Sequence, residues 1–249
     1  MKVAVITPIH SARQEWLETC LASVQAQTHP CTHIVVTDGI AKPPLPDFAG
    51  QYIALERTHA DFGDTPRAIG SMSAISQGFD AIAYLDDDNW YHPQHIETLV
   101  ALHRRTGADV CSSARFHHSL DGHLLFRCTE SGVGFVDTSC YFLARSAFAL
   151  CAQWALMPTR FHPICDRYIF HAAHYLSLRH AQSEFASLHY RNHLIGCYLS
   201  AGLKPPAEAR HPCWNHSLLH DLQAHFASGQ WLRHGTVPVQ ISKGGGALP

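Results

Sequence analysis

The sequence predicts an α/β protein built on one mostly parallel sheet, with helices covering both faces. Short apolar runs alternate with longer amphipathic stretches, the order typical of parallel strands joined by helical crossovers. The runs carry few polar residues, as expected of strands buried on both faces. Polar side chains follow three of these strands, at Thr7-Pro8, at Asp38 and at 86–88. Ligands bind at the carboxyl ends of strands in such sheets, so we expect the functional site at this edge.

The first half of the chain contains most of these elements. Apolar runs predict strands at 3–7, 33–37, 52–55, 81–85 and 109–113. The stretches between them predict helices at 12–27, 65–77 and 93–105. The first helix follows from apolar side chains spaced three and four residues apart, and each of the other two has a proline in its first turn.

The second half is less regular. It predicts a hairpin at 115–127 around Asp121-Gly122, then a short strand and the start of a helix within 132–148. Beyond these we expect a helix at 165–176, a strand at 183–191 and helices at 193–201 and 214–227. The glycine-rich last residues predict a flexible tail.

Composition argues against several classes of protein. The 249 residues carry 18 basic and 20 acidic side chains, a formal net charge of −2, which argues against a general nucleic-acid binder. No apolar stretch approaches the ~20 residues needed to span a bilayer, and we expect no signal peptide. The nine cysteines never form a CxxC pair, so we expect reduced thiols in a cytoplasmic protein. Peripheral contact with a membrane stays open.

The 21 histidines raise the hypothesis of a zinc or metal-storage protein. Three pairs have a helical spacing that can chelate an ion: His171 with His174, His189 with His193, and His216 with His220. No HExxH motif or CxxC pair accompanies them, and a chain so rich in histidine contains such pairs by chance. We therefore interpret most histidines as background composition.

The segment YLDDDNW places Asp86, Asp87 and Asp88 directly after an apolar strand. Like charges repel there and desolvation is unfavourable, so three ionised carboxylates need a counterion. Carboxylate oxygens suit hard cations such as Mg²⁺ or Mn²⁺. If the strand continues, alternation points Asp86 and Asp88 to the same side. The alternative is a solvated acidic loop, or a cap for the helix that starts near Pro93.

Residues 3–39 resemble the opening of the family 2 glycosyltransferases, inverting enzymes with the GT-A fold. The resemblance lies in a strand ending in Thr-Pro, a helix of the form LxxxLxSVxxQT at 17–28, and a strand ending in Asp38-Gly39. The block DTPRAIGSMSAISQGFDAIAYLDDDN at 64–89 is similar to the family segment that runs from an arginine to the acidic motif. The resemblance covers 3–105 well and the rest of the chain loosely.

This resemblance implies an architecture and an activity. We expect one GT-A domain at 1–205, with a nucleotide-binding half at about 1–112, an acceptor half at about 113–205, and a C-terminal helix and flexible tail at 206–249. The implied reaction is metal-dependent inverting transfer of a sugar from a nucleotide-sugar donor, UDP-linked in the first instance, with Mn²⁺ or Mg²⁺. The implied acceptor is a glycan, a lipid-linked saccharide or a small molecule.

The resemblance also implies the residues that bind the nucleotide. Thr7 and Pro8 would line the pocket, and Asp38 would accept a hydrogen bond from the base, usually uracil. Arg67 matches the family arginine near the nucleotide and the sugar, and Asp64, in the same block, is expected beside it. The family asparagine after this arginine is Ala68 here, which leaves the identity of the nucleotide open.

The metal ligands follow from the same comparison. Asp86 would contact the ribose or the sugar and also approach the metal, Asp88 would be a ligand, and Asp87 is the variable middle position at the donor site. Many GT-A enzymes add a histidine from the second half of the chain, for which His189 is our candidate.

A carboxylate is the usual base that takes the proton of the acceptor hydroxyl. The family places this acid at the start of a helix in the second half, often after a glutamate. Here the match is Cys165-Asp166-Arg167, which makes Asp166 the expected base. Asp137 is the alternative base, or a residue that orients the acceptor or the donor sugar.

Two other functions stay open on the sequence alone. The first is a nucleotidyltransferase with a similar sheet, although such enzymes usually carry a glycine-rich basic loop after the first strand, and PIHSARQEW has no glycine. The second is a non-catalytic protein that binds a sugar nucleotide or a metal, which the three acids and Asp166 argue against.

Overall fold

The computed structural model describes residues 1–10, 13–40, 48–128 and 134–229. The strands are β1 (Val3–Ile9), β2 (Cys31–Asp38), β3 (Gln51–Leu55), β4 (Ala81–Tyr84), β5 (Trp90–Tyr91), β6 (Val110–His118), β7 (Leu124–Cys128), β8 (Tyr141–Ala144) and β9 (His180–Arg191). The α-helices are α1 (Gln14–Gln25), α2 (Asp64–Ser76), α3 (His95–Thr106), α4 (Gln153–Leu156), α5 (Cys165–Tyr175), α6 (Ile195–Ser200) and α7 (His216–Ala227). Short 3-10 helices are η1 (Thr138–Cys140), η2 (Arg145–Ala152) and η3 (Thr159–Ile164).

All the described strands join one sheet in the order β3-β2-β1-β4-β8-β6-β9-β5, with β7 paired to the side of β6. Strands β1 to β4, β6 and β9 run in one direction, and β5, β7 and β8 run against them. The expected α/β fold with a mostly parallel sheet is confirmed, with antiparallel strands concentrated in the second half of the sheet.

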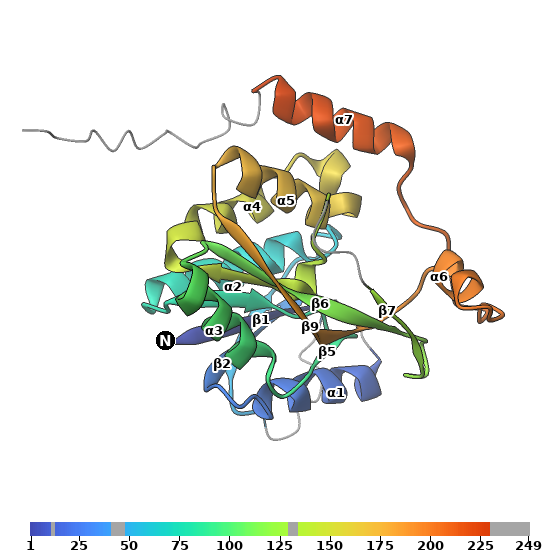
Figure 1. Ribbon diagram of the computed structural model, residues 1–249, viewed down its shortest axis with the longest axis horizontal. Helices are drawn as coiled ribbons and strands as arrows, with labels where there is room; N and C mark the ends of the chain where they lie inside the picture. Colours follow the sequence, from blue (N-terminus) through green and yellow to red (C-terminus); the bar gives the residue numbers. More distant parts are fainter. Residues whose placement is uncertain (11–12, 41–47, 129–133, 230–249) are drawn as a thin grey trace, which may run out of the picture.

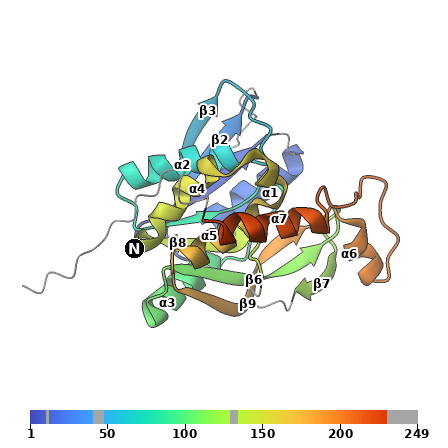
Figure 2. The same cartoon turned by 90° about the horizontal axis from the view of Figure 1, so that it is seen from above.

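Helices cover both faces of this sheet (Figure 1). Helices α1 and α3 lie on one face, and α2, α4 and α5 lie on the other, where α7 packs over α5 (Figures 1 and 2). All residues of β1 are buried, which agrees with an apolar strand between two helical layers. Helix α2 approaches β1 closely at Gly70, where an added Cβ would lie 2.7 Å from Ile6.

The expected strands and helices of the first half are all present, with ends that move by a few residues. Helix α1 buries Leu17, Cys20, Leu21 and Val24, the apolar positions whose spacing predicted it. The sequence missed β5, because two residues carry no periodic signal. The division expected near residue 112 falls inside β6, and the glycine-rich tail expected at 244–249 lies outside the described residues.

The described part of the chain contains no disulfide. None of its helices combines the length and the apolar character that a bilayer crossing requires.

Candidate active site

The three consecutive acids lie at the edge of the sheet where β1, β2 and β4 end, but they form a turn after β4. The backbone N–H of Asn89 donates to the Asp86 carbonyl over 3.1 Å. From the second half of the chain, the Ser139 hydroxyl accepts hydrogen bonds from the Asp86 backbone N–H (3.1 Å) and from the Asn89 amide (3.2 Å). Strand alternation therefore does not apply to Asp86 and Asp88, and their carboxylates have different partners.

Asp86 is held by a buried arginine. The Arg67 guanidinium, in a residue only 3% exposed, donates to Asp86 (2.5 Å), to Asp64 (3.2 Å) and to the Phe62 carbonyl (2.8 Å). The Asp64 side chain is fully buried, and His162 from η3 lies 2.7 Å from its second oxygen. Burial alone would lower the pKa of Arg67, but the Asp86 and Asp64 carboxylates raise it above its usual range. Arg67 therefore serves as an internal cation that links α2 to the acidic turn.

The surroundings of Asp87 disfavour its ionised form. Burial, followed by the charges of Asp88 and Asp86, raises its pKa to about 8. A backbone hydrogen bond from His10 opposes this rise. The repulsion inferred from three adjacent acids is therefore present in the fold, where it contributes to the raised pKa of the middle residue.

Asp88 has a histidine partner, and that partner is His193. Nε2 of His193 lies 2.9 Å from Oδ2 of Asp88, and both side chains are 24% exposed. His189, the histidine expected from sequence, instead bonds to His118 through Nδ1 (2.9 Å) and stacks on Trp90 with the ring planes 2° apart. In the part of the chain that the structure describes, no group of three or more His, Cys, Asp and Glu side chains is arranged to hold a metal ion.

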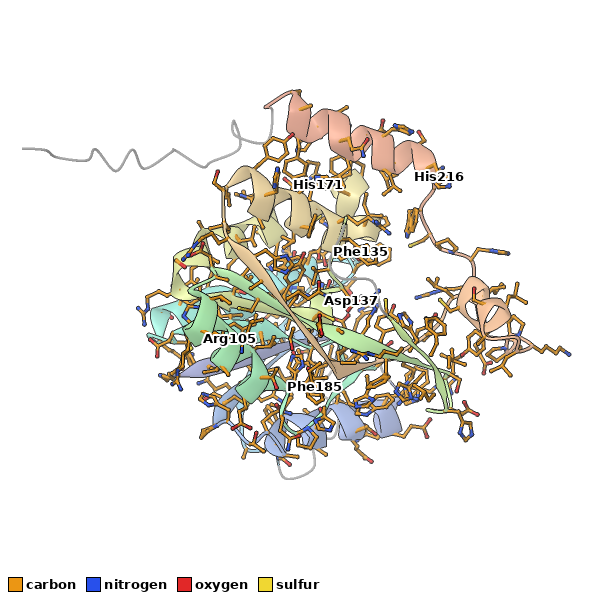
Figure 3. All side chains as sticks on the ribbon, in the orientation of Figure 1. Arg105, Phe135, Asp137, His171, Phe185 and His216 are labelled. Atoms are coloured by element: carbon orange, nitrogen blue, oxygen red, sulfur yellow. The ribbon has the colours of Figure 1, made fainter. Side chains whose placement is uncertain are left out.

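Two further carboxylates come from the second half of the chain. Asp137 accepts a hydrogen bond from the Ser139 backbone N–H (3.0 Å) and lies between the sheet and the α5 layer (Figure 3). Burial raises the pKa of Asp137 to about 7; a nearby arginine opposes the rise, and the Asp86 and Asp166 carboxylates add to it. Asp166, at the start of α5, accepts from the Arg167 backbone N–H (2.7 Å), and burial raises its pKa as well. Asp137 thus interacts electrostatically with Asp86 of the acidic turn and with Asp166, which places carboxylates from three segments in one region.

Tyr190 of β9 belongs to the same region. Burial raises the pKa of its phenol well above the usual range, and the Asp137 and Asp88 carboxylates add to the rise. Side chains alternate along a strand, so Tyr190 and its neighbour His189 point to opposite faces. This alternation explains why His189 does not reach Asp88, while His193, beyond the end of β9, does.

Thr7, Pro8 and Asp38, the residues expected at the nucleotide pocket, each have a different set of neighbours. Thr7 is fully buried, and its hydroxyl lies 2.7 Å from Nε2 of His33, so its side chain faces the interior. Pro8 packs against the loop before α2, where a Cβ on Gly63 would lie 3.0 Å from the proline ring. Asp38, only 3% exposed, is hydrogen-bonded to His59.

Comparison with known proteins decides the family. The model of glycosyl transferase family 2 matches residues 4–146, more than half of the chain. The chain belongs to this family. By family it is therefore a glycosyltransferase. No curated protein sequence matches it.

Solved structures of the S. aureus protein TarS share the fold of this family 2 glycosyltransferase. TarS aligns with a TM-score of 0.59 and 14% identity over 91% of this chain, which spans only 43% of the TarS chain. TarS 1–349 in complex with UDP aligns with a TM-score of 0.59 and 14% identity, covering 95% of this chain and 76% of that one. TarS 1–349 in complex with UDP-GlcNAc aligns with a TM-score of 0.58 and 14% identity, covering 91% and 73%.

The sequence of this glycosyltransferase indicated the acids of the site but not the histidines that pair with them. Asp64, Arg67 and Asp86 form one contiguous group, as their shared assignment to the donor site would require. The sequence missed His162 and His193. The spacing between His189 and His193 was the one available signal for the latter, and it did not show which of the two reaches an acid.

Proposed function

We propose that this chain is an inverting glycosyltransferase that moves a sugar from a UDP-linked donor to an acceptor hydroxyl with the help of Mn²⁺ or Mg²⁺. The observation that carries the proposal is the electrostatic interaction of Asp137 with both Asp86 of the acidic turn and Asp166, which places carboxylates from three segments in one region. A displacement at a sugar carbon needs a cation for the departing diphosphate and a base for the incoming hydroxyl, and this region has candidates for both.

The possible metal ligands at Asp88 fit a divalent cation that also binds the substrate. The Asp88 carboxylate and the His193 imidazole provide one oxygen and one nitrogen donor on neighbouring segments. Mg²⁺ and related ions in such sites commonly take one or two protein ligands, and substrate phosphates and water complete the shell. When bound, the ion would stabilise the negative charge of the departing diphosphate. Asp86 is already paired with Arg67, so its proposed role is to position the acidic turn and contact the donor.

Asp166 is the proposed base. A general base works best when its pKa lies near the working pH, and burial raises the pKa of Asp166 from the ordinary carboxyl range. Asp137 has a pKa of about 7 and is the alternative. Because Asp137 also caps η1 through Ser139, we assign it the orienting role and Asp166 the proton transfer.

The proposed donor is a uridine diphosphate sugar, whereas the proposed acceptor is given only by class. Complexes of TarS with UDP and UDP-GlcNAc, on a similar fold, favour uridine diphosphate sugars as the first donors to test. The acceptor is proposed as a glycan, a lipid-linked saccharide or a small molecule. We place the reaction in the cytoplasm, where thiols stay reduced.

The test is metal-dependent release of UDP from UDP-sugars, measured with and without Mn²⁺ and with chelator. We expect release by the wild-type chain, its loss on adding chelator, and its loss in Asp88→Asn. Asp121→Asn, in the exposed β6–β7 turn, is the matched control and should behave as wild type. Full turnover by Asp88→Asn in the presence of chelator would disprove the metal site.

A further inference from the structure

At the carboxyl end of β2, a histidine covers the Asp38 carboxylate. The Asp38 side chain is 4% exposed, and its two oxygens accept from the His59 backbone N–H over 3.1 and 3.0 Å. Nδ1 of the His59 ring lies 2.6 Å from Oδ1 of Asp38. The His59 side chain is 37% exposed. At this strand end, the imidazole of His59 is thus the more accessible polar group.

The backbone around Asp38 holds His59 in this place. The Thr58 hydroxyl donates to the Asp38 carbonyl over 3.1 Å, and the Gly39 N–H donates to the Leu55 carbonyl over 3.0 Å. Gly39 has a φ of +68°, and a Cβ there would lie 2.2 Å from the Thr58 nitrogen. Only glycine permits this approach, so the loop that carries His59 lies directly against the strand end.

The contact with Asp38 defines which atom of the ring faces outward. An ionised carboxylate can only accept, so Nδ1 of His59 must donate its proton to Asp38. In a neutral imidazole, the other nitrogen, Nε2, is then a hydrogen-bond acceptor. The same arrangement orients the histidines of metal and catalytic sites, where a carboxylate fixes the tautomer.

We propose that His59 reads the nucleobase of the donor, with Nε2 accepting the ring N–H of the base. The inference rests on the proposed function, because it requires a nucleotide donor at this edge. Strand β1 separates β2 from β4, so the end of β2 lies about 10 Å from the acidic turn, given the usual strand spacing. A ribose and a base can cover that separation when the diphosphate lies at Asp88.

The chemistry of the base edge predicts a preference. Uracil presents N3–H between two carbonyl oxygens, and this proton can be donated to Nε2 of His59. Cytosine presents an unprotonated N3 at the same position, so two lone pairs would face each other. A fixed acceptor therefore favours uracil over cytosine, because the wrong base leaves a polar group unpaired. Asp38, expected from the sequence to contact the base itself, becomes the residue that orients His59.

The test compares UDP and CDP binding by calorimetry, using the full chain with Mn²⁺. The side-chain amide of His59→Asn reaches the position of Nδ1, so this variant keeps a partner for Asp38. It removes Nε2, the atom proposed to accept the hydrogen bond from the base. His59→Gln places an amide oxygen near the position of Nε2 and should retain part of the preference. His123→Asn, on the exposed β6–β7 turn, is the control for a general loss of histidine.

We expect the wild-type chain to bind UDP more tightly than CDP. In His59→Asn, UDP binding should weaken about three- to tenfold, the effect of losing one hydrogen bond, while CDP binding stays near the wild-type value. Unchanged CDP binding also shows that the variant is folded. A His59→Asn protein with the wild-type UDP affinity and UDP-to-CDP ratio would overturn the inference, as would a wild-type preference for CDP. A wild-type chain that binds neither nucleotide refutes the proposed function itself, and the inference fails with it.

Discussion

Replacing Arg67 by methionine tests whether a buried cation holds the acidic turn. The side chain is almost fully buried and donates to two carboxylates, Asp64 and Asp86, as well as to a backbone carbonyl. Methionine keeps much of the volume and removes the charge, which leaves both carboxylates without their cation. Removing one partner of a buried ion pair costs about 3–5 kcal/mol. For a chain of this size, that corresponds to a melting temperature lower by roughly 6–20 °C.

The chain offers a matched control for this measurement. Arg145 also pairs with an aspartate, Asp80, over 2.8 Å, but the two side chains are 61% and 41% exposed. Such surface pairs contribute about 0–1 kcal/mol, so Arg145→Met should unfold almost as the wild type does.

The assay is urea unfolding of the wild type, Arg67→Met and Arg145→Met, followed by circular dichroism at several pH values. Burial already raises the pKa of Asp64, and the charge of Arg67 opposes that rise. Once Arg67 is gone, the native state should therefore bind a proton on Asp64 still more tightly than the unfolded chain does. The loss should therefore be largest near neutral pH and shrink as the pH falls through the ordinary carboxyl range. Equal stabilities of Arg67→Met and Arg145→Met at neutral pH would refute the reasoning.

Two further predictions follow from the acidic turn. His193→Ala should raise the Mn²⁺ concentration that gives half-maximal UDP release by about tenfold or more, because it removes a proposed ligand. His189→Ala should leave that concentration unchanged. Equal shifts in both titrations would contradict the assignment of His193 as the metal ligand. Asp87→Asn should stabilise the metal-free chain increasingly as the pH rises from about 4 to 8, by roughly 2–5 kcal/mol at the upper end. The native pKa of Asp87 is about 8, so the wild-type fold loses stability when the Asp87 carboxyl loses its proton. Urea unfolding in chelator at about pH 5 and pH 8.5 measures this difference, and a gain that is the same at both values would speak against the raised pKa of Asp87.

Local pattern predicted the elements well because apolar periodicity follows from burial. The buried face of α1 is the one that its spacing indicated, and β1 is buried along its whole length. The position of the acids was also predictable. Parallel strands that neighbour one another must end at the same edge, so the residues after β1, β2 and β4 share that edge.

The partners of those acids were not predictable from pattern. His193 reaches Asp88 from 105 positions along the chain, and His162 reaches Asp64 from 98. Nothing in the sequence near either histidine differs from the many others, and His189 was favoured only by the family resemblance and by its place near the end of a predicted strand. Only the alternation along β9, together with the turn after β4, decides which imidazole meets a carboxylate.

The sequence by itself determined the alternation of strands and helices and the edge of the sheet where chemistry is possible, because these depend on local periodicity and on strand ends. Its motifs, compared with those of known proteins, also determined the family. The tertiary structure decided that Asp38 faces His59, that Asp86 is neutralised by Arg67 and that Asp88 pairs with His193. These pairings depend on loops that pack together from distant segments. Burial there forces each carboxylate to find a donor, and the fold alone specifies which donor lies within reach.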